Sequence, residues 1–402
     1  MPRSTVVRPD EIRRHNLSQV LQQVHRRGAL TRAELTASLG LNRSTIGDLV
    51  GDLVRRGMVD ERVPGGGEKA GRPSHVVAPR SDGPYVLAVE VEVERIVSAA
   101  VGLGGRVHVR HETVVAEPSP AAVVAQIARD AARLAAQMPA SATLVGVGVS
   151  VPGTIQRADG LVVHAPNLRW RNVPLGAKLR SRLGDGLDVR IGNNANLGAL
   201  AEHQRGAARQ LRDVVYIVGS VGVGGGVIVD GAEVYGAGGY AGEIGHIMLS
   251  PDGPECHCGS NGCVETYIGE HALLAEAGIE ADAFGPAAVA AVLADAEAGR
   301  QPAAGAVATV ATGLGRTLAI LINVFNPEAI VVGDTLAEIL RIERERIERE
   351  VARRAMAEAR GAAALLTPAL GRDASLIGAS ELAFQYALTA LIARDRAHSS
   401  PG

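Results

Sequence analysis

The sequence has few aromatic residues and few cysteines. Only 2% of its 402 residues are aromatic, whereas 47% are hydrophobic, and three are Cys. A chain of this length and apolar content can build cores for two or three domains, which excludes wholesale disorder. Because aromatic side chains are scarce, the core must be made mainly of Ala, Val, Leu and Ile.

Long apolar runs are also missing. Gly and charged residues interrupt every stretch that approaches the length needed to cross a bilayer. The first residues, Met1-Pro2-Arg3-Ser4, lack the apolar region of a secretory signal. We therefore expect a cytoplasmic protein that does not use a membrane.

Charge is nearly balanced over the whole chain but is unevenly distributed. The net charge is −2, yet residues 1–80 carry 14 Lys and Arg against 8 Asp and Glu, while the remainder carries 27 against 35. A basic end on an acidic body indicates a partner that is a polyanion. Chance clustering of Arg would give the same count, so charge alone does not decide the function.

Residues 1–80 have the pattern of a winged helix-turn-helix domain. Apolar residues recur at helical spacing from Ile12 to Val24, and Thr31-Arg32-Ala33-Glu34 is a capping-box sequence that predicts a second helix. Gly40 predicts a tight turn, and Asn42 predicts the N-cap of a third helix. Residues 58–78 then predict a β-hairpin with a basic, Gly-rich tip, and residues 79–84 predict a linker.

The third helix of such a domain enters the major groove of DNA with its first residues near the base edges. Arg43, Ser44 and Thr45 occupy that position and can bond bases or phosphates. Four further basic residues are candidates for phosphate contacts: Arg55, Arg56, Lys69 and Arg72. The alternative is a small helical domain whose Arg side chains are only solvated.

From residue 84 to residue 396 the pattern is that of an α/β body. Strands are expected at 86–89, 96–101 and 144–149, and a helix is expected at 120–137. Gly-rich segments at 219–226 and 236–245 predict turns, a polar helix is expected at 336–360, and a last helix at 376–394.

All three Cys residues lie between positions 256 and 263, in the spacing His246-x9-Cys256-x-Cys258-x4-Cys263. One imidazole and three thiolates are a ligand set that suits tetrahedral zinc with no open position, so the site is expected to be structural. Gly259 and Gly262 allow the backbone to wrap closely around an ion. The alternative, three reduced thiols that share a loop by accident, is disfavoured because no other Cys occurs in the chain.

These residues carry a resemblance to a known family. The segment Tyr240-Ala241-Gly242-Glu243-Ile244-Gly245-His246, followed by the Cys cluster and Val264-Glu265, resembles the signature of the ROK family of repressors, open reading frames and sugar kinases. Val151-Pro152-Gly153 and Asn326-Pro327-Glu328 match the same family in order. The resemblance implies an actin-like, two-lobed ATPase fold, with a small lobe at about 84–195 plus the C-terminal helix and a large lobe at about 196–375. The basic head resembles that of ROK repressors, which ROK sugar kinases lack.

The resemblance also implies residues that bind a sugar between the lobes. They share polar side chains or backbone that suit sugar hydroxyls, and they are Gly153, Asn167, Asn193, Asn194, Glu243, His246 and Glu265. His246 would also ligate zinc. The alternative for the two Glu residues is support of the zinc loop, and the alternative for Asn167 is a turn residue.

The chain departs from the kinases of this family at two places. Where they have Asn-Asp-Ala-Asn, with the Asp as general base, this chain has Asn193-Asn194-Ala195-Asn196, and an amide cannot accept the proton. Where they have the phosphate loop Asp-x-Gly-Gly-Thr, this chain has Glu-Val-Glu-Val-Glu at residues 90–94. This alternation of charged and apolar residues predicts a β-strand at the surface. Negative charge there would repel a triphosphate.

The sequence thus predicts a repressor that binds operator DNA, senses a sugar or sugar-like effector and does not act as a kinase. A homodimer or tetramer is expected, because paired heads need half-sites about 34 Å apart. Two alternatives are an active sugar kinase with a DNA-binding head and a constitutive DNA-binding protein whose body only dimerises.

Overall fold

The computed structural model describes residues 9–63, 75–115, 117–184 and 186–393. The chain divides into two compact units, each built from more than one segment. Unit 1 comprises residues 1–151, 158–192 and 379–402, and unit 2 comprises residues 152–157 and 193–378. Each unit is described by itself.

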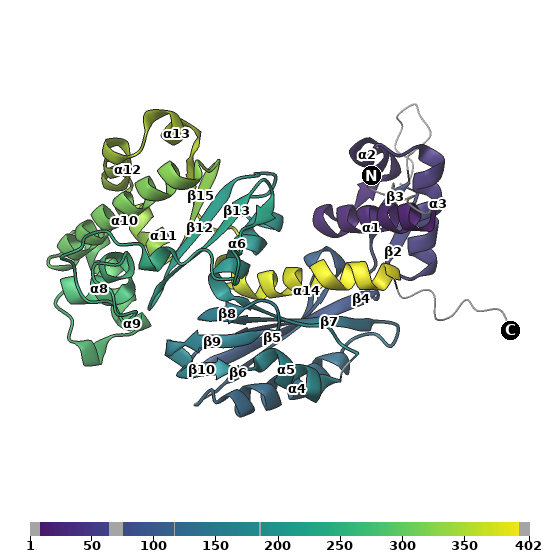
Figure 1. Cartoon of the computed structure of the whole chain (residues 1–402), viewed down its shortest axis with the longest axis horizontal. Coiled ribbons are helices and arrows are strands. Elements are labelled where there is room, and N and C mark those ends of the chain that lie inside the picture. The colour runs from purple at the N-terminus through teal and green to yellow at the C-terminus, as the bar shows by residue number, and fades with distance from the viewer. Residues whose placement is uncertain (1–8, 64–74, 116, 185, 394–402) are drawn as a thin grey trace, which may run out of the picture. The chain divides into compact units, whose positions relative to one another are not determined.

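The N-terminal head of unit 1 holds three helices and a small sheet (Figure 1). The helices are α1 (Pro9–Arg27), α2 (Arg32–Leu39) and α3 (Arg43–Arg55), and the sheet has the order β1 (Leu30–Thr31), β3 (Val76–Pro79), β2 (Val59–Arg62). A helix-turn-helix followed by a β-hairpin is the predicted winged arrangement. The short strand β1, which pairs with β3, was not predicted.

Local signals in the sequence set the ends of these helices. Thr31 forms the predicted capping box with Glu34, and Gly40 ends α2 with a positive φ of 66°. The side chain of Asn42 accepts a hydrogen bond from the backbone N–H of Thr45 at 2.8 Å, as predicted for the N-cap of α3. Gly40 and Asn42 together fix the turn that presents the first residues of α3.

The body of unit 1 is a five-stranded sheet in the order β11-β7-β4-β5-β6. Its strands are β4 (Pro84–Val91), β5 (Arg95–Gly102), β6 (Val107–Val114), β7 (Thr143–Val151) and β11 (Val189–Asn193). Every residue of β4 is buried, because β4 lies between β5 and β7 in the middle of the sheet. The helices α4 (Pro120–Ala135) and α5 (Leu175–Leu183) and the paired strands β9 (Leu161–Ala165) and β10 (Trp170–Val173) complete this unit.

Unit 2 is built around a second five-stranded sheet, in the order β14-β13-β12-β15-β16. Its strands are β12 (Val214–Gly219), β13 (Val223–Val229), β14 (Ala232–Glu233), β15 (Ala329–Asp334) and β16 (Ala364–Leu366), and the short β8 (Thr154–Gln156) also belongs to this unit. The helices are α6 (Asn194–Gln204), α7 (Glu265–Ile268), α8 (Glu270–Glu276), α9 (Pro286–Glu297), α10 (Ala303–Phe325), α11 (Thr335–Ile342), α12 (Arg344–Arg354) and α13 (Ala357–Ala362). The alternation of strands and helices confirms the predicted α/β class.

The last helix, α14 (Ala374–Ala393), belongs to both units. Its first residues, 374–378, are part of unit 2, and the remainder is part of unit 1. Gly378 lies against α6, since a Cβ at this position would be 1.9 Å from the carbonyl oxygen of Leu197. Gly148 of β7 lies equally close to the other part of the helix, since a Cβ there would be 1.8 Å from the carbonyl oxygen of Ala379.

Two predictions of local structure were wrong. The polar helix predicted at 336–360 is three helices, α11, α12 and α13, because the backbone leaves helical geometry at Glu343 (φ −115°) and at Ala355 (ψ 142°). The segment 90–94 is not one alternating strand. Glu90 and Val91 end the buried strand β4, and residues 92–94 form the turn into β5.

Two helical segments are long and apolar enough to cross a membrane by length and composition, Ala303–Phe325 and Gly371–Ala393. In both, 67% of the most apolar window is buried inside the protein. The helix α10 is packed in the core of unit 2, where Val307, Val310 and Leu314 are fully buried. This is the burial expected of a core helix.

The buried carboxylate of Glu202, at the end of α6, is expected to be important for stability. It accepts hydrogen bonds from the backbone N–H groups of Ala207 (2.7 Å), Ala369 (3.1 Å) and Leu370 (2.8 Å). Glu202→Ala leaves these three donors without this acceptor, so the free energy of unfolding should fall by about 3 kcal/mol in guanidinium titrations. The control Glu276→Ala, on the surface of α8, should stay within about 0.5 kcal/mol of wild type. An equal effect of both variants would contradict this assignment.

Candidate functional site

Four predicted metal ligands come together in unit 2. The ligand atoms of His246, Cys256, Cys258 and Cys263 all lie within 4.8 Å of one another. The Cys256 Sγ is 3.7 Å from the His246 Nδ1, and the Cys258 Sγ is 3.7 Å from the Cys263 Sγ. These separations are those of donors around a single ion, so the cluster can hold a metal.

Glycines allow the loop to close around these donors. At Gly262, φ is 67° and a Cβ would lie 1.7 Å from the carbonyl oxygen of Ser250. Gly259 also has a positive φ, 90°, and its N–H bonds the carbonyl oxygen of Cys256 at 2.9 Å. Any side chain at position 262 would force this loop apart, which explains the Gly there.

The three thiols differ in their ease of ionisation. Burial raises the pKa of the Cys263 thiol to about 12. The backbone N–H of Ser260 lowers the pKa of Cys258, which is exposed. A metal ion binds thiolates, so its binding to this cluster would release protons and would be favoured by higher pH.

Glu265 lies directly after the metal loop and is held on both oxygens. Its Oε1 is 2.9 Å from the Nδ1 of His257, and its Oε2 accepts a hydrogen bond from the backbone N–H of Val223 at 2.9 Å. Val223 begins β13, so the turn within the Gly-rich segment predicted at 219–226 is only residues 220–222, and Gly224 to Gly226 belong to the strand. The Glu265 carboxylate is thus fixed at the point where the metal loop meets the sheet.

His257 was missed by the sequence analysis. It stands between two Cys ligands, and its ring lies 5.5 Å from that of His246 in an edge-on arrangement. With Cys256 and Glu265 it forms a second group of donors, close enough together to hold a metal. The signal that identifies it is its position inside the Cys-x-Cys pair.

Glu243 is the second carboxylate of this region. Although its side chain still reaches solvent, desolvation raises the pKa of the carboxyl group. His246 lowers this pKa and Glu265 raises it, so both groups are close enough to act on the charge of Glu243. Two carboxylates and two imidazoles therefore share one region of unit 2.

The amides at the start of α6 have different roles. The Asn193 Oδ1 accepts hydrogen bonds from the backbone N–H groups of Ala195 (2.8 Å) and Asn196 (3.1 Å), which makes Asn193 the N-cap of α6. Its Nδ2 donates to the carbonyl oxygen of Gly153 at 2.9 Å. Asn194 is the first residue of α6 and is half-buried. Asn193 therefore joins the loop of Gly153 to the start of α6.

Asn167 belongs to unit 1, unlike the other residues predicted to bind a ligand. It is exposed and lies in a 3-10 turn (Pro166–Leu168) between β9 and β10. This position agrees with the alternative reading of Asn167 as a turn residue, and its role in ligand binding stays a prediction.

The residues predicted to read DNA lie at the first turn of α3. Arg43 and Ser44 are exposed and Thr45 is half-buried. The Ser44 hydroxyl donates to the Asn42 side chain at 2.7 Å, so only its lone pairs are available to a partner. Arg43 is therefore the side chain of this turn best suited to reach a base edge.

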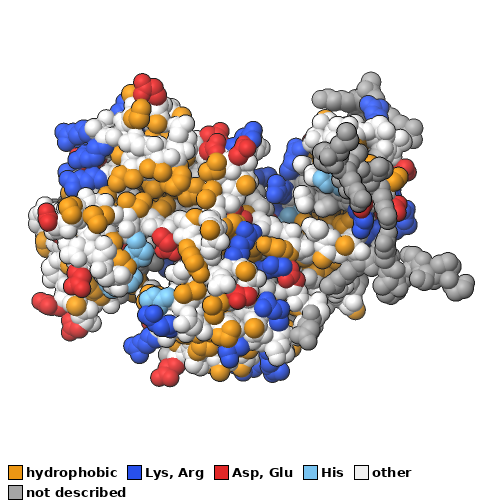
Figure 2. Space-filling model, viewed as in Figure 1, with side chains coloured by type: hydrophobic (Ala, Val, Ile, Leu, Met, Phe, Trp, Pro, Cys, Tyr) orange, Lys and Arg blue, Asp and Glu red, His pale blue; other side chains and the backbone are white. Residues whose placement is uncertain are grey.

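The other basic candidates are not equivalent. Arg55 and Arg56 both pair with Asp52, but Arg55 is 69% exposed with its nearest contact at 3.5 Å, whereas Arg56 is 18% exposed and donates to Asp52 at 3.2 Å. Arg56 thus stabilises α3 and is less available to phosphate than Arg55. Lys69 and Arg72 lie outside the described residues. Basic side chains are visible on the head in Figure 2.

The segment predicted to replace a phosphate loop is a closed turn. The N–H of Glu92 bonds the carbonyl oxygen of Arg95 at 2.9 Å. The Glu92 carboxylate accepts two hydrogen bonds of 2.7 Å from the Arg95 guanidinium, which also donates to Glu112 at 3.1 Å. Ion pairs and the side chain of Val93 occupy a turn where backbone N–H groups would have to face a phosphate.

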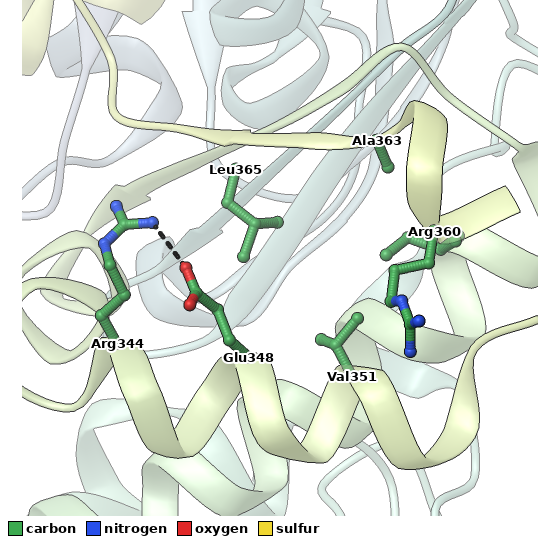
Figure 3. Close-up of a pocket in the computed structure, with 7 residues that line it drawn as sticks. Arg344, Glu348, Val351, Arg360, Ala363 and Leu365 are labelled. Carbon is green, nitrogen blue, oxygen red and sulfur yellow. Dashed lines mark hydrogen bonds and ion pairs between the residues drawn. The ribbon is translucent and has the colours of Figure 1, made fainter. Parts of the chain in front are cut away.

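A separate pocket of about 230 Å³ lies in unit 2 among α10, α12, α13 and β16 (Figure 3). It has apolar walls from Val351, Ala363 and Leu365. Arg344 is paired with Glu348 at 3.2 Å at its edge. None of the residues predicted to bind a ligand lines this pocket, so it is distinct from the candidate site.

Comparison with known proteins places these features in a family. Residues 86–386 match the model of the ROK family. The xylose repressor of Bacillus subtilis is 28% identical over 378 residues, which cover 94% of this chain and 97% of that protein. A crystal structure of a ROK family transcriptional regulator, a homologue of the Escherichia coli MLC protein, has a TM-score of 0.78 at 24% identity and covers 95% of this chain and 98% of its own.

A kinase is also similar, over a shorter part of the chain. The ROK family glucokinase of Streptomyces griseus, in complex with glucose and AMPPNP, has a TM-score of 0.61 at 30% identity. That match covers 75% of this chain and 99% of the glucokinase. The matches to the repressor and to the regulator therefore cover more of this chain than the match to the glucokinase, by about a fifth of its length.

The metal cluster leads to a direct prediction. Purified wild-type chain should carry one metal ion per chain in elemental analysis, and Cys258→Ser should lose most of it, because three donors hold an ion less well than four. The variant should also unfold at a lower temperature. Ser260→Ala, in the same loop, is the control and should keep the metal. A wild-type chain purified without any metal would contradict the assignment.

Proposed function

This chain belongs to the ROK family, and on that premise we propose that it is a ligand-responsive transcriptional repressor that binds operator DNA. The observation that carries the proposal is the extent of the matches. The Bacillus subtilis xylose repressor is similar over the head as well as the body, and the head has the fold of a winged helix-turn-helix with Arg43 exposed at the first turn of α3.

We propose a sugar or a sugar-like molecule as the effector. Glu243 and Glu265 offer carboxylate oxygens for pairs of hydroxyl groups, and Asn194 offers an amide next in sequence to Asn193, which holds Gly153. Asn167, Asn193 and His246 complete the proposed set. A xylose repressor and a glucose-bound kinase among the similar proteins support a small sugar as the class of ligand.

We propose further that the protein does not phosphorylate this sugar. Asn194 cannot act as a general base at neutral pH, which removes a contribution of about 10² to 10⁴ to the rate. The closed, acidic turn of residues 92–94 offers no backbone cradle to a triphosphate. Because a similar protein is a glucokinase, an active kinase with a DNA-binding head is the competing hypothesis.

The metal of the Cys3His cluster is proposed to be zinc in a structural role. Three thiolates and one imidazole match its preference for sulfur and nitrogen donors in a closed tetrahedron. The ion would tie the loop of residues 246–263 to Glu265, which follows directly. It would thus keep one carboxylate of the ligand site in place without taking part in any reaction.

A homodimer or a larger assembly in the cytoplasm completes the proposal. Two heads are needed to span two half-sites of an operator about one helical turn apart. For the sugar to regulate, it must bind one arrangement of the chain more tightly than the other. A constitutive DNA-binding protein, which no sugar affects, is the second competing hypothesis.

The DNA-reading turn is tested by Arg43→Ala. Operator fragments selected from genomic DNA by the wild-type protein should bind this variant about 10- to 100-fold more weakly, because a bidentate contact to a base contributes about 1–3 kcal/mol. Arg133→Ala, which removes an exposed charge from α4, should bind as wild type does. Equal affinities of wild type and Arg43→Ala would show that α3 does not read DNA.

The ligand site is tested by calorimetry with D-xylose and D-glucose, together with an assay for sugar phosphate in the presence of ATP and magnesium. We expect binding of at least one sugar, weaker binding by Glu243→Gln and Glu265→Gln, and no turnover. Asn194→Asp should stay inactive, since it restores only the general base. Turnover at ordinary enzyme rates of about 1–10³ per second by the wild type would establish the kinase hypothesis instead.

A further inference from the structure

A buried histidine connects the head to the body of unit 1. His25, in the last turn of α1, is 3% exposed. Its Nε2 lies 2.9 Å from the Oε2 of Glu381 in α14, and its Nδ1 accepts a hydrogen bond from the backbone N–H of Gly104 at 3.1 Å. The ring also lies 4.5 Å from that of Phe384, in the next turn of α14.

These contacts restrict the ring to one orientation. Because Nδ1 accepts from Gly104, the hydrogen of a neutral ring must be on Nε2, where it is donated to Glu381. Glu381 is 1% exposed, so its carboxylate depends on partners inside the protein. Rotation of the ring would break both hydrogen bonds, so the contact holds α1 in one position on α14.

On the head side, α1 is joined firmly to the helix proposed to read DNA. Arg13 of α1 donates to Asp52 of α3 at 2.9 Å. The buried faces of the two helices are apolar, with Val20, Leu21 and Val24 on α1 and Leu49, Val50 and Leu53 on α3. A displacement of α1 therefore displaces α3 with it.

On the body side, the start of α14 is joined to α6, whose first residue is Asn194. Gly378 packs on the backbone of Leu197 without room for a side chain. Glu202, at the other end of α6, holds the backbone N–H groups of Ala369 and Leu370 just before α14 begins. Both contacts lie within unit 2, so the start of α14 is packed on α6 and the segment before α14 is hydrogen-bonded to α6.

We propose that the His25–Glu381 pair is the positioning contact that passes effector binding at α6 to the DNA-reading head. Glu381 lies three residues after Gly378, less than one turn further along the same helix. A change at Asn194 that moves α6 therefore moves α14 and reaches His25 through a single helical element. This inference rests on the proposed function, since it assumes a ligand at α6 and DNA at α3.

The test compares His25→Ala and Glu381→Ala with wild type in the full chain. In wild type, saturating D-xylose should change operator affinity by at least about 5-fold. In both variants this ratio should fall toward 1, while calorimetric affinity for D-xylose stays the same. His25→Gln should keep most of the response, because its amide can accept from Gly104 and donate to Glu381. His15→Ala, on the exposed face of α1, is the matched control.

Hydrogen exchange at the Gly104 amide gives a readout that needs neither sugar nor DNA. The amide should exchange faster in His25→Ala than in wild type, and at the wild-type rate in His15→Ala. Unchanged exchange, or a wild-type response to D-xylose in both Ala variants, would overturn the proposal. If wild type binds neither D-xylose nor D-glucose, the proposed effector is wrong. Exchange at the Gly104 amide still shows whether His25 holds the head on the body, because it needs no sugar. Glu381→Ala removes the same contact from the side of α14. If one of the two Ala variants fails to fold, the other still tests the proposal.

Discussion

The arrangement of the candidate site depends on the amide of Asn193. Its oxygen caps α6, and its nitrogen holds the carbonyl of Gly153, so one side chain joins the helix to the loop that follows β7. Capping groups of this kind satisfy backbone donors that would otherwise face solvent or a ligand. Both amide atoms of Asn193 already make hydrogen bonds within the protein. Asn194, the first residue of α6, is therefore the neighbouring amide that we propose for ligand binding. The two adjacent Asn residues thus differ because one is the N-cap of α6 and the other is its first helical residue.

Local features of the fold were predictable because their causes are local. The capping box at Thr31, the N-cap at Asn42 and the turn at Gly40 each need only a few neighbouring residues, and the structure has all three. The Cys cluster was predictable for the same reason, since its donors lie within one loop. The breaks at Glu343 and Ala355 were missed, because nothing in the helical pattern of 336–360 marks them.

Contacts between segments that are distant in the sequence could not be predicted from the hydrophobic and polar pattern. His25 and Glu381 are 356 positions apart, and in the sequence each looks like an ordinary polar residue of a helix. The pairing of His257 with Glu265 was also missed, although the residues are close in sequence, because it depends on how the metal loop turns. The roles of the predicted ligand residues likewise depend on a bound molecule, which pattern and fold do not supply.

The turn at residues 92–94 supports the proposal that this chain does not phosphorylate a sugar. The ion pair of Glu92 with Arg95 closes the turn between β4 and β5, and the ion pair of Arg95 with Glu112 joins β5 to β6. Flexible glycines in such a loop lower stability unless a nucleotide is there to order them. If this chain binds no nucleotide, as proposed, residues that stabilise the sheet can stand at these positions without loss of function.

The order of α1 and α14 along the chain has a consequence for biosynthesis. The head precedes the body in the chain and contains its own apolar core, so it can fold while the body is still being translated. Its docking partner Glu381 follows β16 and is therefore synthesised after all the strands of both five-stranded sheets. A head that folds at that stage is tethered to the chain but cannot yet dock on Glu381. In the coupling proposed above, the effector therefore cannot act on the head before α14 has been synthesised.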